Sequence, residues 1–197
     1  MIFSSIEKIL YLIAPIVLAG VFNMIFVKLP ILNNLKIPID NGKVLKDGRR
    51  LFGDNKTWKG FWGMIVFTSF WFIVSEFLVK NFLCVKELSL IPFDSFNFPF
   101  SAWLFGAIWG FAYVFAELPN SYAKRRLNIE PGKKGSGFLG YLFYFIDQGD
   151  SVIGCLIALP IFYKASFADA FAIFIIGSAV HLLTNLVLYK AKLKREV

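Results

Sequence analysis

Two aspartates, Asp147 and Asp150, lie three residues apart inside an otherwise apolar stretch of the sequence. Residues with this spacing project from the same face of a helix. A carboxylate within a bilayer costs at least about 2.5–3.5 kcal/mol on insertion scales, so the pair predicts a functional site. Without a cation between them the two charges repel, and oxygen-only ligands favour Mg²⁺. The alternative is a structural role, in which lysines or polar groups of neighbouring helices pair with the carboxylates.

A second polar group follows the preceding apolar stretch. Glu117 ends that stretch, and Lys124, Arg125 and Arg126 come shortly after it. A carboxylate beside basic side chains can hold a metal ion and the phosphates that the ion bridges, because Arg offers a fork that matches phosphate and Lys a point charge. A charge cluster that merely ends a membrane span is the structural alternative.

A glycine-flanked segment, Gly53 to Gly60, contains Lys56 and Thr57. Its Gly-x-x-Lys-Thr piece is similar to the end of a phosphate-binding P-loop, although the leading glycine is missing and no strand precedes it. A helix that begins near Gly60 would present backbone N–H groups and its positive dipole end to a phosphate. We expect Lys56 to face water and to contribute little to the core. Contact of this basic loop with anionic lipid is the alternative.

Long apolar blocks must position these residues. Hydrophobic residues make up 57% of the 197 and charged residues 17%, and the apolar residues form blocks long enough to cross a bilayer. The pattern predicts an all-α integral membrane protein with about five transmembrane helices in a single domain, residues 1–197. The expected spans cover residues 9–27, 61–79, 100–118, 138–163 and 168–189. The expected cytoplasmic loops cover residues 28–60 and 119–137.

The basic residues are distributed unequally between the two sides of the membrane. Of 21 Lys and Arg, eight lie between Lys28 and Lys59, five lie in the loop after the third span, and four lie in the tail. Five spans place these segments on one side, which the positive-inside rule makes cytoplasmic. We therefore expect a multi-pass protein of the cell membrane with its N-terminus outside, its C-terminus inside and its site facing the cytoplasm. The net charge of +8 then reflects topology, and no soluble basic domain is left to bind nucleic acid.

Three motifs follow one another along the chain: Gly53-Asp-Asn-Lys-Thr-Trp-Lys-Gly60, Glu117-Leu-Pro-Asn-Ser-Tyr-Ala-Lys-Arg-Arg126 and Asp147-Gln-Gly-Asp-Ser-Val-Ile-Gly154. Together with the five-span layout, they resemble the CDP-archaeol synthase family, which is related to the CDP-diacylglycerol synthases. The chain lacks the His-Gly-Gly run that precedes the aspartates of the larger bacterial relatives, and it is shorter. These departures favour the archaeol-type branch.

The resemblance implies that a cytidylyl group passes from CTP to a membrane lipid phosphate, with Mg²⁺ present and pyrophosphate released. Asp147, Asp150 and Glu117 would then hold the metal, and Lys124 would join the two aspartates as a catalytic residue. The implied phosphate ligands are Lys56, Thr57, Ser121, Arg125 and Arg126. The implied partners are CTP, the lipid phosphate and the bilayer.

Two alternatives stay open. The lipid phosphate could be a diacyl phosphatidic acid rather than an archaetidic-acid-like ether lipid, because tail selection depends on groove shape. A different class is an ion- or proton-coupled transporter that uses Asp147, Asp150 and His181, although the sequence has no inverted repeat. His181 and Asn185, four apart in the last span, share a face. They could line the same cavity, but we expect them to bond a neighbouring helix.

Overall fold

The structure is a computed structural model that describes residues 4–95, 101–133 and 135–194. Within these ranges it contains five long helices and four short ones. The long helices are α1 (Ile6–Lys28), α2 (Trp58–Asn81), α4 (Ser101–Arg126), α5 (Gly137–Ala158) and α6 (Phe167–Lys190). The short ones are α3 (Leu83–Lys86) and the 3₁₀ turns η1 (Asn33–Leu35), η2 (Phe93–Ser95) and η3 (Leu159–Ile161). Each long helix is long and apolar enough to cross a membrane, which confirms the predicted fold class.

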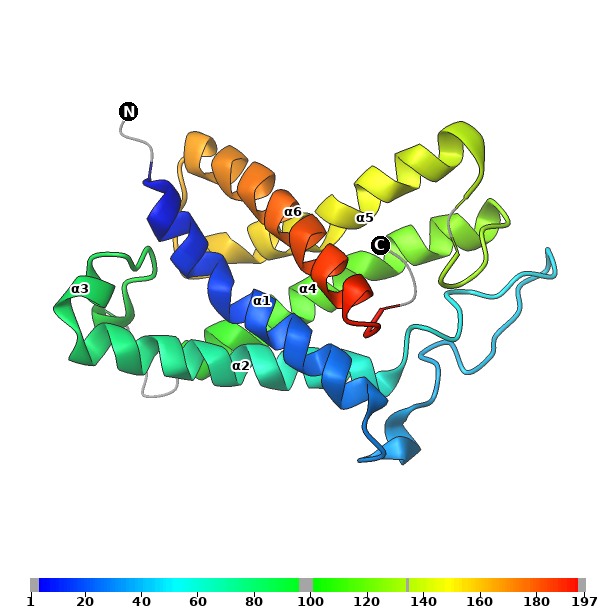
Figure 1. The fold of residues 1–197 in the computed structure, drawn as a ribbon, viewed down its shortest axis with the longest axis horizontal. Coiled ribbons are helices and arrows are strands. Elements are labelled where there is room, and N and C mark those ends of the chain that lie inside the picture. The colour runs from blue at the N-terminus through cyan, green and yellow to red at the C-terminus, as the bar shows by residue number, and fades with distance from the viewer. Residues whose placement is uncertain (1–3, 96–100, 134, 195–197) are drawn as a thin grey trace.

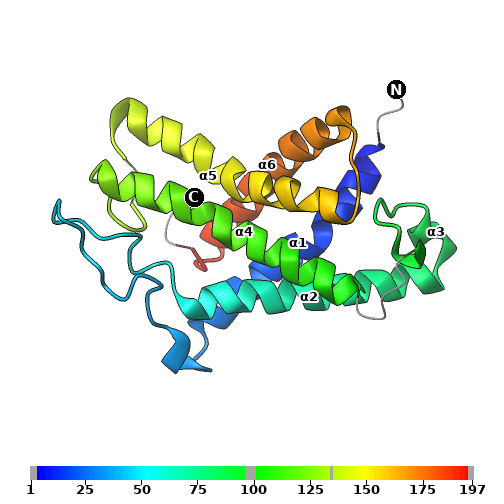
Figure 2. The same ribbon diagram turned by 180° about the vertical axis from the view of Figure 1, so that it is seen from behind.

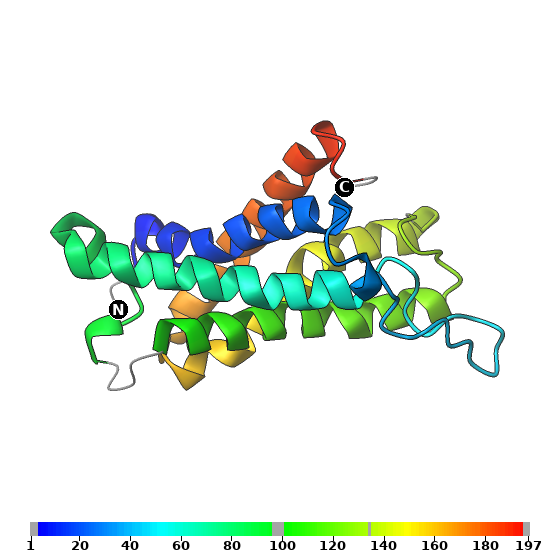
Figure 3. The ribbon, with the colours of Figure 1, turned by 90° about the horizontal axis from the view of Figure 1, so that it is seen from below.

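The five long helices form a closed series of neighbours. Helix α2 packs on α1 and α4, α4 packs on α5, α5 packs on α6, and α6 returns to α1 (Figures 1 and 2). The N-terminal part of α1 and the α3 segment lie toward one end of the long axis. The α1–α2 and α4–α5 loops lie toward the other end (Figure 3), which we call the basic end after the charged residues of these loops. Phe100, Lys134 and Arg195, which entered the expected spans and the charge count, lie outside the described residues.

Helix α4 extends further than the hydropathy suggests. The third span is expected to end at residue 118, whereas α4 continues through Pro119 to Arg126. Hydropathy marks where apolar residues stop, not where helical hydrogen bonding stops, so the second motif is helical rather than a loop. As a consequence Glu117, Asn120 and Lys124 recur at helical spacing along one face of α4.

Small residues let α4 approach both of its neighbours. A Cβ atom at Gly106 would lie 2.5 Å from the Ser69 Cα of α2, and one at Gly154 of α5 would lie 2.5 Å from the Ala116 Cβ of α4. Gly106 and Gly110 are four residues apart, the spacing that permits close contact of membrane helices. This close packing fixes how far the polar face of α4 stands from α5.

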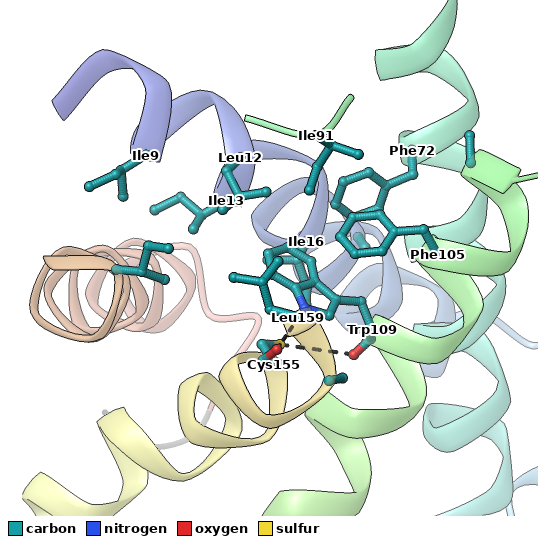
Figure 4. Packing of buried hydrophobic residues seen from close by; sticks show 14 of the residues in the cluster. Ile9, Leu12, Ile13, Ile16, Phe72, Ile91, Phe105, Trp109, Cys155 and Leu159 are labelled. Atoms are coloured by element: carbon teal, nitrogen blue, oxygen red, sulfur yellow. Dashed lines mark hydrogen bonds between the residues drawn. The ribbon is translucent and has the colours of Figure 1, made fainter. Parts of the chain in front are cut away.

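The part of the bundle away from the basic end has an apolar core (Figure 4). Phe72, Phe105 and Trp109 pack against one another with ring centroids 4.6–5.4 Å apart. The indole N–H of Trp109 donates to the Cys155 carbonyl at 2.8 Å, so this buried polar group is satisfied. The core joins α2, α4 and α5 and thereby orients the polar residues further along these helices.

Candidate active site

Asp147 and Asp150 of α5 converge on one side chain of α4. Asn120 Nδ2 donates hydrogen bonds to Asp147 Oδ1 and to Asp150 Oδ2, each at 2.7 Å. Lys124, one turn further along α4, forms an ion pair with Asp147. Neighbouring helices thus bring the predicted aspartate pair and Lys124 together. At Asp147 the carboxylate already has a basic partner, as the structural alternative anticipated.

Glu117, one turn before Asn120, pairs with Lys56 from the segment that precedes α2. The Lys56 side chain is 20% exposed and that of Glu117 is 23% exposed, so the expectation that Lys56 faces water is wrong. Burial opposes the charge of Lys56, but the Glu117 carboxylate outweighs it and raises the pKa of Lys56 above its ordinary value. Glu117 is 61 residues away from Lys56 in sequence, so no local pattern indicates the pairing.

A carboxylate that the sequence did not single out organises the loop before α2. Asp40 accepts three backbone N–H bonds at 2.9–3.1 Å and pairs with Arg50 at 2.6 Å. Burial alone would raise the pKa of Asp40, but these donors outweigh burial and hold it well below the ordinary value. Backbone bonds from Ile39 N–H to the Lys56 carbonyl and from Trp58 N–H to the Ile37 carbonyl then hold Lys56 at the start of α2.

Two of the predicted phosphate ligands, Thr57 and Arg126, have structural partners within the chain. Thr57 Oγ1 caps α2 by accepting the Gly60 N–H at 3.2 Å. Arg126 forms an ion pair with Asp47 and donates to the Arg49 carbonyl at 3.3 Å. Arg126 therefore fastens the end of α4 to the α1–α2 loop, and the structure does not bond it to the aspartate pair.

Arg125 and Ser121 are buried, with 6% and 7% of their surface exposed. Arg125 Nε donates to the Ser121 carbonyl at 3.4 Å, and Arg125 Nη1 is buried without a hydrogen-bond partner in the described part of the chain. A charged donor left unused in this way is costly, and an anion would satisfy it. The charged neighbour of Arg125 is Glu130 rather than the aspartate pair.

A hydrogen-bond chain ties the aspartate segment to α6. The His181 ring lies 3.2 Å from Tyr113 Oη through Nε2 and 3.3 Å from the Gln148 carbonyl through Nδ1. Asn185 Nδ2 donates to Gln148 Oε1 at 3.1 Å. His181 and Asn185 thus bond neighbouring helices, as expected from their shared face. Because Gln148 directly follows Asp147, these bonds also support the aspartate-bearing turn.

The oxygen atoms around Asn120 fit a magnesium ion in part. Among the described residues, no three His, Cys, Asp or Glu side chains gather closely enough to form a metal site, and Glu117 is paired with Lys56. Asp147 and Asp150 nevertheless both accept hydrogen bonds from the Asn120 amide nitrogen. Asn120 Oδ1 is buried and has no hydrogen-bond partner among the residues that the structure describes. Mg²⁺ commonly uses one or two carboxylates, keeps several waters and completes its shell with substrate phosphates, so this donor set suits it.

Comparison with known proteins identifies the family to which this arrangement belongs. The model of the CarS-like family, described as CDP-archaeol synthase, matches residues 2–197. The chain belongs to the CDP-archaeol synthase family. The prediction of an enzyme, a CTP-dependent lipid nucleotidyltransferase, is thereby confirmed. Membership favours the enzyme over a transporter built on Asp147, Asp150 and His181.

Relatives and a solved structure cover most of the chain. The CDP-archaeol synthase of Methanococcoides burtonii is 30% identical over 165 residues, which are 81% of this chain and 89% of the relative. That of Pyrococcus furiosus is 32% identical over 158 residues, which are 80% of this chain and 81% of the relative. A solved intramembrane enzyme for archaeal membrane lipids biosynthesis superposes with a TM-score of 0.62 over 94% of both chains, at 22% identity. This likeness shows that the fold is shared.

Proposed function

We propose that the protein transfers a cytidylyl group from CTP to an archaetidic-acid-like ether lipid phosphate, which yields a CDP-activated lipid and pyrophosphate. The observation that carries the proposal is the convergence of Asp147 and Asp150 on Asn120, with Lys124 and Lys56 beside them. These charged groups lie along the helices between the apolar core and the basic end of a membrane-spanning bundle, where we expect a water-soluble nucleotide and the phosphate of a membrane lipid to meet. The family of the chain supports this choice of reaction.

The reaction requires little covalent chemistry from the protein. An oxygen of the lipid phosphate forms a bond to the α-phosphorus of CTP, and the bond from that phosphorus to the bridging oxygen of the β-phosphate breaks. Pyrophosphate leaves with the electron pair. The second pKa of a phosphate monoester is about 6, so the attacking oxygen is already largely deprotonated at neutral pH. The side chains must therefore position two anionic reactants in line and reduce their repulsion.

Lys124 and Lys56 are suited to that task because each already lies against a carboxylate. When phosphates enter, each ammonium can exchange its carboxylate partner for a phosphate oxygen. Lys124 would then release Asp147, and Lys56 would release Glu117. Arg125, with its unpartnered Nη1, is a further donor on the same helix. In this proposal Ser121 supports Arg125 through its carbonyl, and Thr57 keeps its role as the cap of α2.

Asp147 and Asp150 would hold Mg²⁺, with Glu117 as a further oxygen donor once Lys56 has left it. The ion, when bound, neutralises charge on the triphosphate and polarises the bond to the leaving group. Turning the Asn120 amide would direct its unpartnered Oδ1 toward the same place. The proposal also includes the orientation expected from the positive-inside rule, with the basic end in the cytoplasm, where CTP is available.

The test is an assay of the purified protein in detergent with CTP, Mg²⁺ and either an ether-linked or an ester-linked lipid phosphate. We expect pyrophosphate and a CDP-lipid in equal amounts, with the ether substrate used more efficiently. Faster turnover of the ester substrate would favour the diacyl alternative. Absence of pyrophosphate with both lipids would refute the proposed reaction, and a chelator added to a parallel sample tests the requirement for Mg²⁺.

A further inference from the structure

The chain turns back on itself after α6. Lys192 has a φ of 56°, in the left-handed region, and the Leu193 N–H bonds the Leu188 carbonyl at 2.8 Å. This pattern is a Schellman-type helix end, which reverses the direction of the chain. Lys28, the last residue of α1, donates through Nζ to the Lys192 carbonyl at 2.7 Å. The turn is therefore held by a second helix and is not simply a frayed helix end.

The turn returns Lys194 to the bundle. Its Nζ donates to Asn185 Oδ1 at 2.9 Å, and Asn185 is in turn bonded to Gln148, the residue after Asp147. Burial lowers the pKa of Lys194, and the carboxylates of Glu117 and Asp147 oppose that effect. The ammonium therefore lies within the electrostatic reach of the candidate active site, although it comes from the tail.

Lys194 differs from the other lysines of the site in its partner. Lys56 and Lys124 each have a carboxylate, whereas the only hydrogen bond of the Lys194 ammonium within the described ranges is to a neutral amide. An ammonium has three donors, so two N–H groups stay available to a ligand. A half-buried cation with unused donors, beside a site for anionic reactants, has the properties of a phosphate ligand.

We propose that Lys194 binds a phosphate group of the substrates and that the turn at Lys192 exists to deliver it. This inference rests on the proposed function, since it assigns the tail to the same site. The phosphate belongs either to CTP or to the lipid, and the two share the chemistry that Lys194 would recognise. The competing explanation is a favourable charge at the C-terminal end of α6, which would affect stability and not substrate binding.

The experiment compares Lys194→Met, Lys194→Arg and the matched control Lys190→Met, which removes an exposed lysine four residues earlier. Removing a charge-assisted hydrogen bond should raise the KM for one substrate about tenfold or more, with a smaller change in kcat. We expect Lys194→Arg to restore most of the affinity and Lys190→Met to behave like the wild type. Titrating CTP at saturating lipid phosphate, and the reverse, tells which phosphate is bound. Lys28→Met, which releases the Lys192 carbonyl, should shift the same KM by a smaller factor.

Kinetics of Lys194→Met equal to those of Lys190→Met would overturn the proposal, and so would a lower melting temperature with an unchanged KM. Calorimetric binding of inorganic pyrophosphate with Mg²⁺ separates this inference from the proposed reaction. If the wild type forms no CDP-lipid but binds pyrophosphate more tightly than Lys194→Met does, the reaction is wrong and the phosphate ligand stands. Equal pyrophosphate affinity of Lys194→Met, Lys190→Met and the wild type would exclude the phosphates of CTP as its ligand and, together with an unchanged KM for the lipid phosphate, would overturn the proposal.

Discussion

Replacing Asp147 and Asp150 one at a time by Asn should lower activity in both variants but lower stability only in the Asp147 variant. Asp147 is paired with Lys124, and their side chains are 39% and 15% exposed for Asp147 and Lys124 respectively. Asp150 accepts hydrogen bonds from Asn120 and the Ser151 N–H and has no ion pair among the described residues. Replacing Asp147 by Asn therefore leaves a half-buried lysine unpaired, whereas replacing Asp150 by Asn removes only a like charge from the same helical face.

The magnitudes follow from the exposure of these groups. An exposed ion pair contributes at most about 1 kcal/mol, and breaking a fully buried one costs about 3–5 kcal/mol. The partly exposed Asp147–Lys124 pair lies between these limits, so Asp147→Asn should cost about 1–2 kcal/mol. For a chain of this size that corresponds to a melting temperature lowered by about 2–8 °C. Asp150→Asn should leave the melting temperature within about 2 °C of the wild type.

Activity should respond differently, because both carboxylates are proposed to hold the ion that neutralises the reacting phosphates. Each variant should lose turnover by about 100-fold to 1,000-fold, the usual effect of removing one group that stabilises transition-state charge. The measurements are pyrophosphate release and thermal unfolding in the same detergent. Glu130→Gln is the control, because it removes a carboxylate whose side chain is 66% exposed. Retained turnover in both variants would remove the aspartates from the active site. A larger loss of stability in Asp150→Asn than in Asp147→Asn would refute the pairing.

Four further expectations follow from the structure. The pKa of Asp40 is lowered in the folded protein, so its charged form stabilises the fold by about 1–3 kcal/mol. This stabilisation is present above the ordinary pKa of about 3.9 and is lost as pH falls through the lowered value. The difference in melting temperature between the wild type and Asp40→Asn should therefore narrow below about pH 4. Gly154→Val should destabilise the bundle by about 1–3 kcal/mol in thermal unfolding, whereas Gly20→Ala, which meets nothing within 4 Å, should not. Lys56→Ala should raise the KM for CTP and also lower the melting temperature, because Glu117 is left without its partner, and Glu117→Gln in the same chain should recover part of the stability. A reporter fused to the C-terminus should read cytoplasmic and one fused to the N-terminus external, and the opposite result would invert the proposed topology.

The membrane-spanning helices could be predicted from the sequence because each is encoded locally. Apolar blocks of about 20 residues have few structural solutions in a bilayer, and all five blocks are long helices here. The end of α4 could not be placed in the same way, since charged residues can continue a helix beyond the apolar region. Extending the helical period past Pro119 would have put Asn120 on the face shared by Glu117 and Lys124, so a signal for Asn120 was present in the spacing.

The rest of the site depends on contacts that no local pattern encodes. Lys56 and Glu117 are 61 residues apart in sequence, and Asn185 meets Gln148 across 37 residues. Lys194 reaches Asn185 only because Lys192 adopts a left-handed conformation, which a lysine seldom does without support. Asp40 organises its loop through backbone N–H groups, whose positions depend on the completed turn and not on residue type.

The two ion pairs of the candidate site would couple the binding of a nucleotide to the binding of a cation. Lys56 and Lys124 neutralise Glu117 and Asp147, so these four charged groups are matched in the structure. A phosphate that takes a lysine leaves a carboxylate without its partner, and a cation that takes a carboxylate leaves a lysine without its own. Either event alone would therefore leave one of these four half-buried charges without its partner, while the two together would leave all four matched. If the proposed site is correct, binding of the nucleotide and of the ion should therefore favour each other, and this coupling would be reciprocal. The apolar core and the close α4–α5 contact would support the proposed exchange, since they would hold the helices in place while the partners of the charged side chains change.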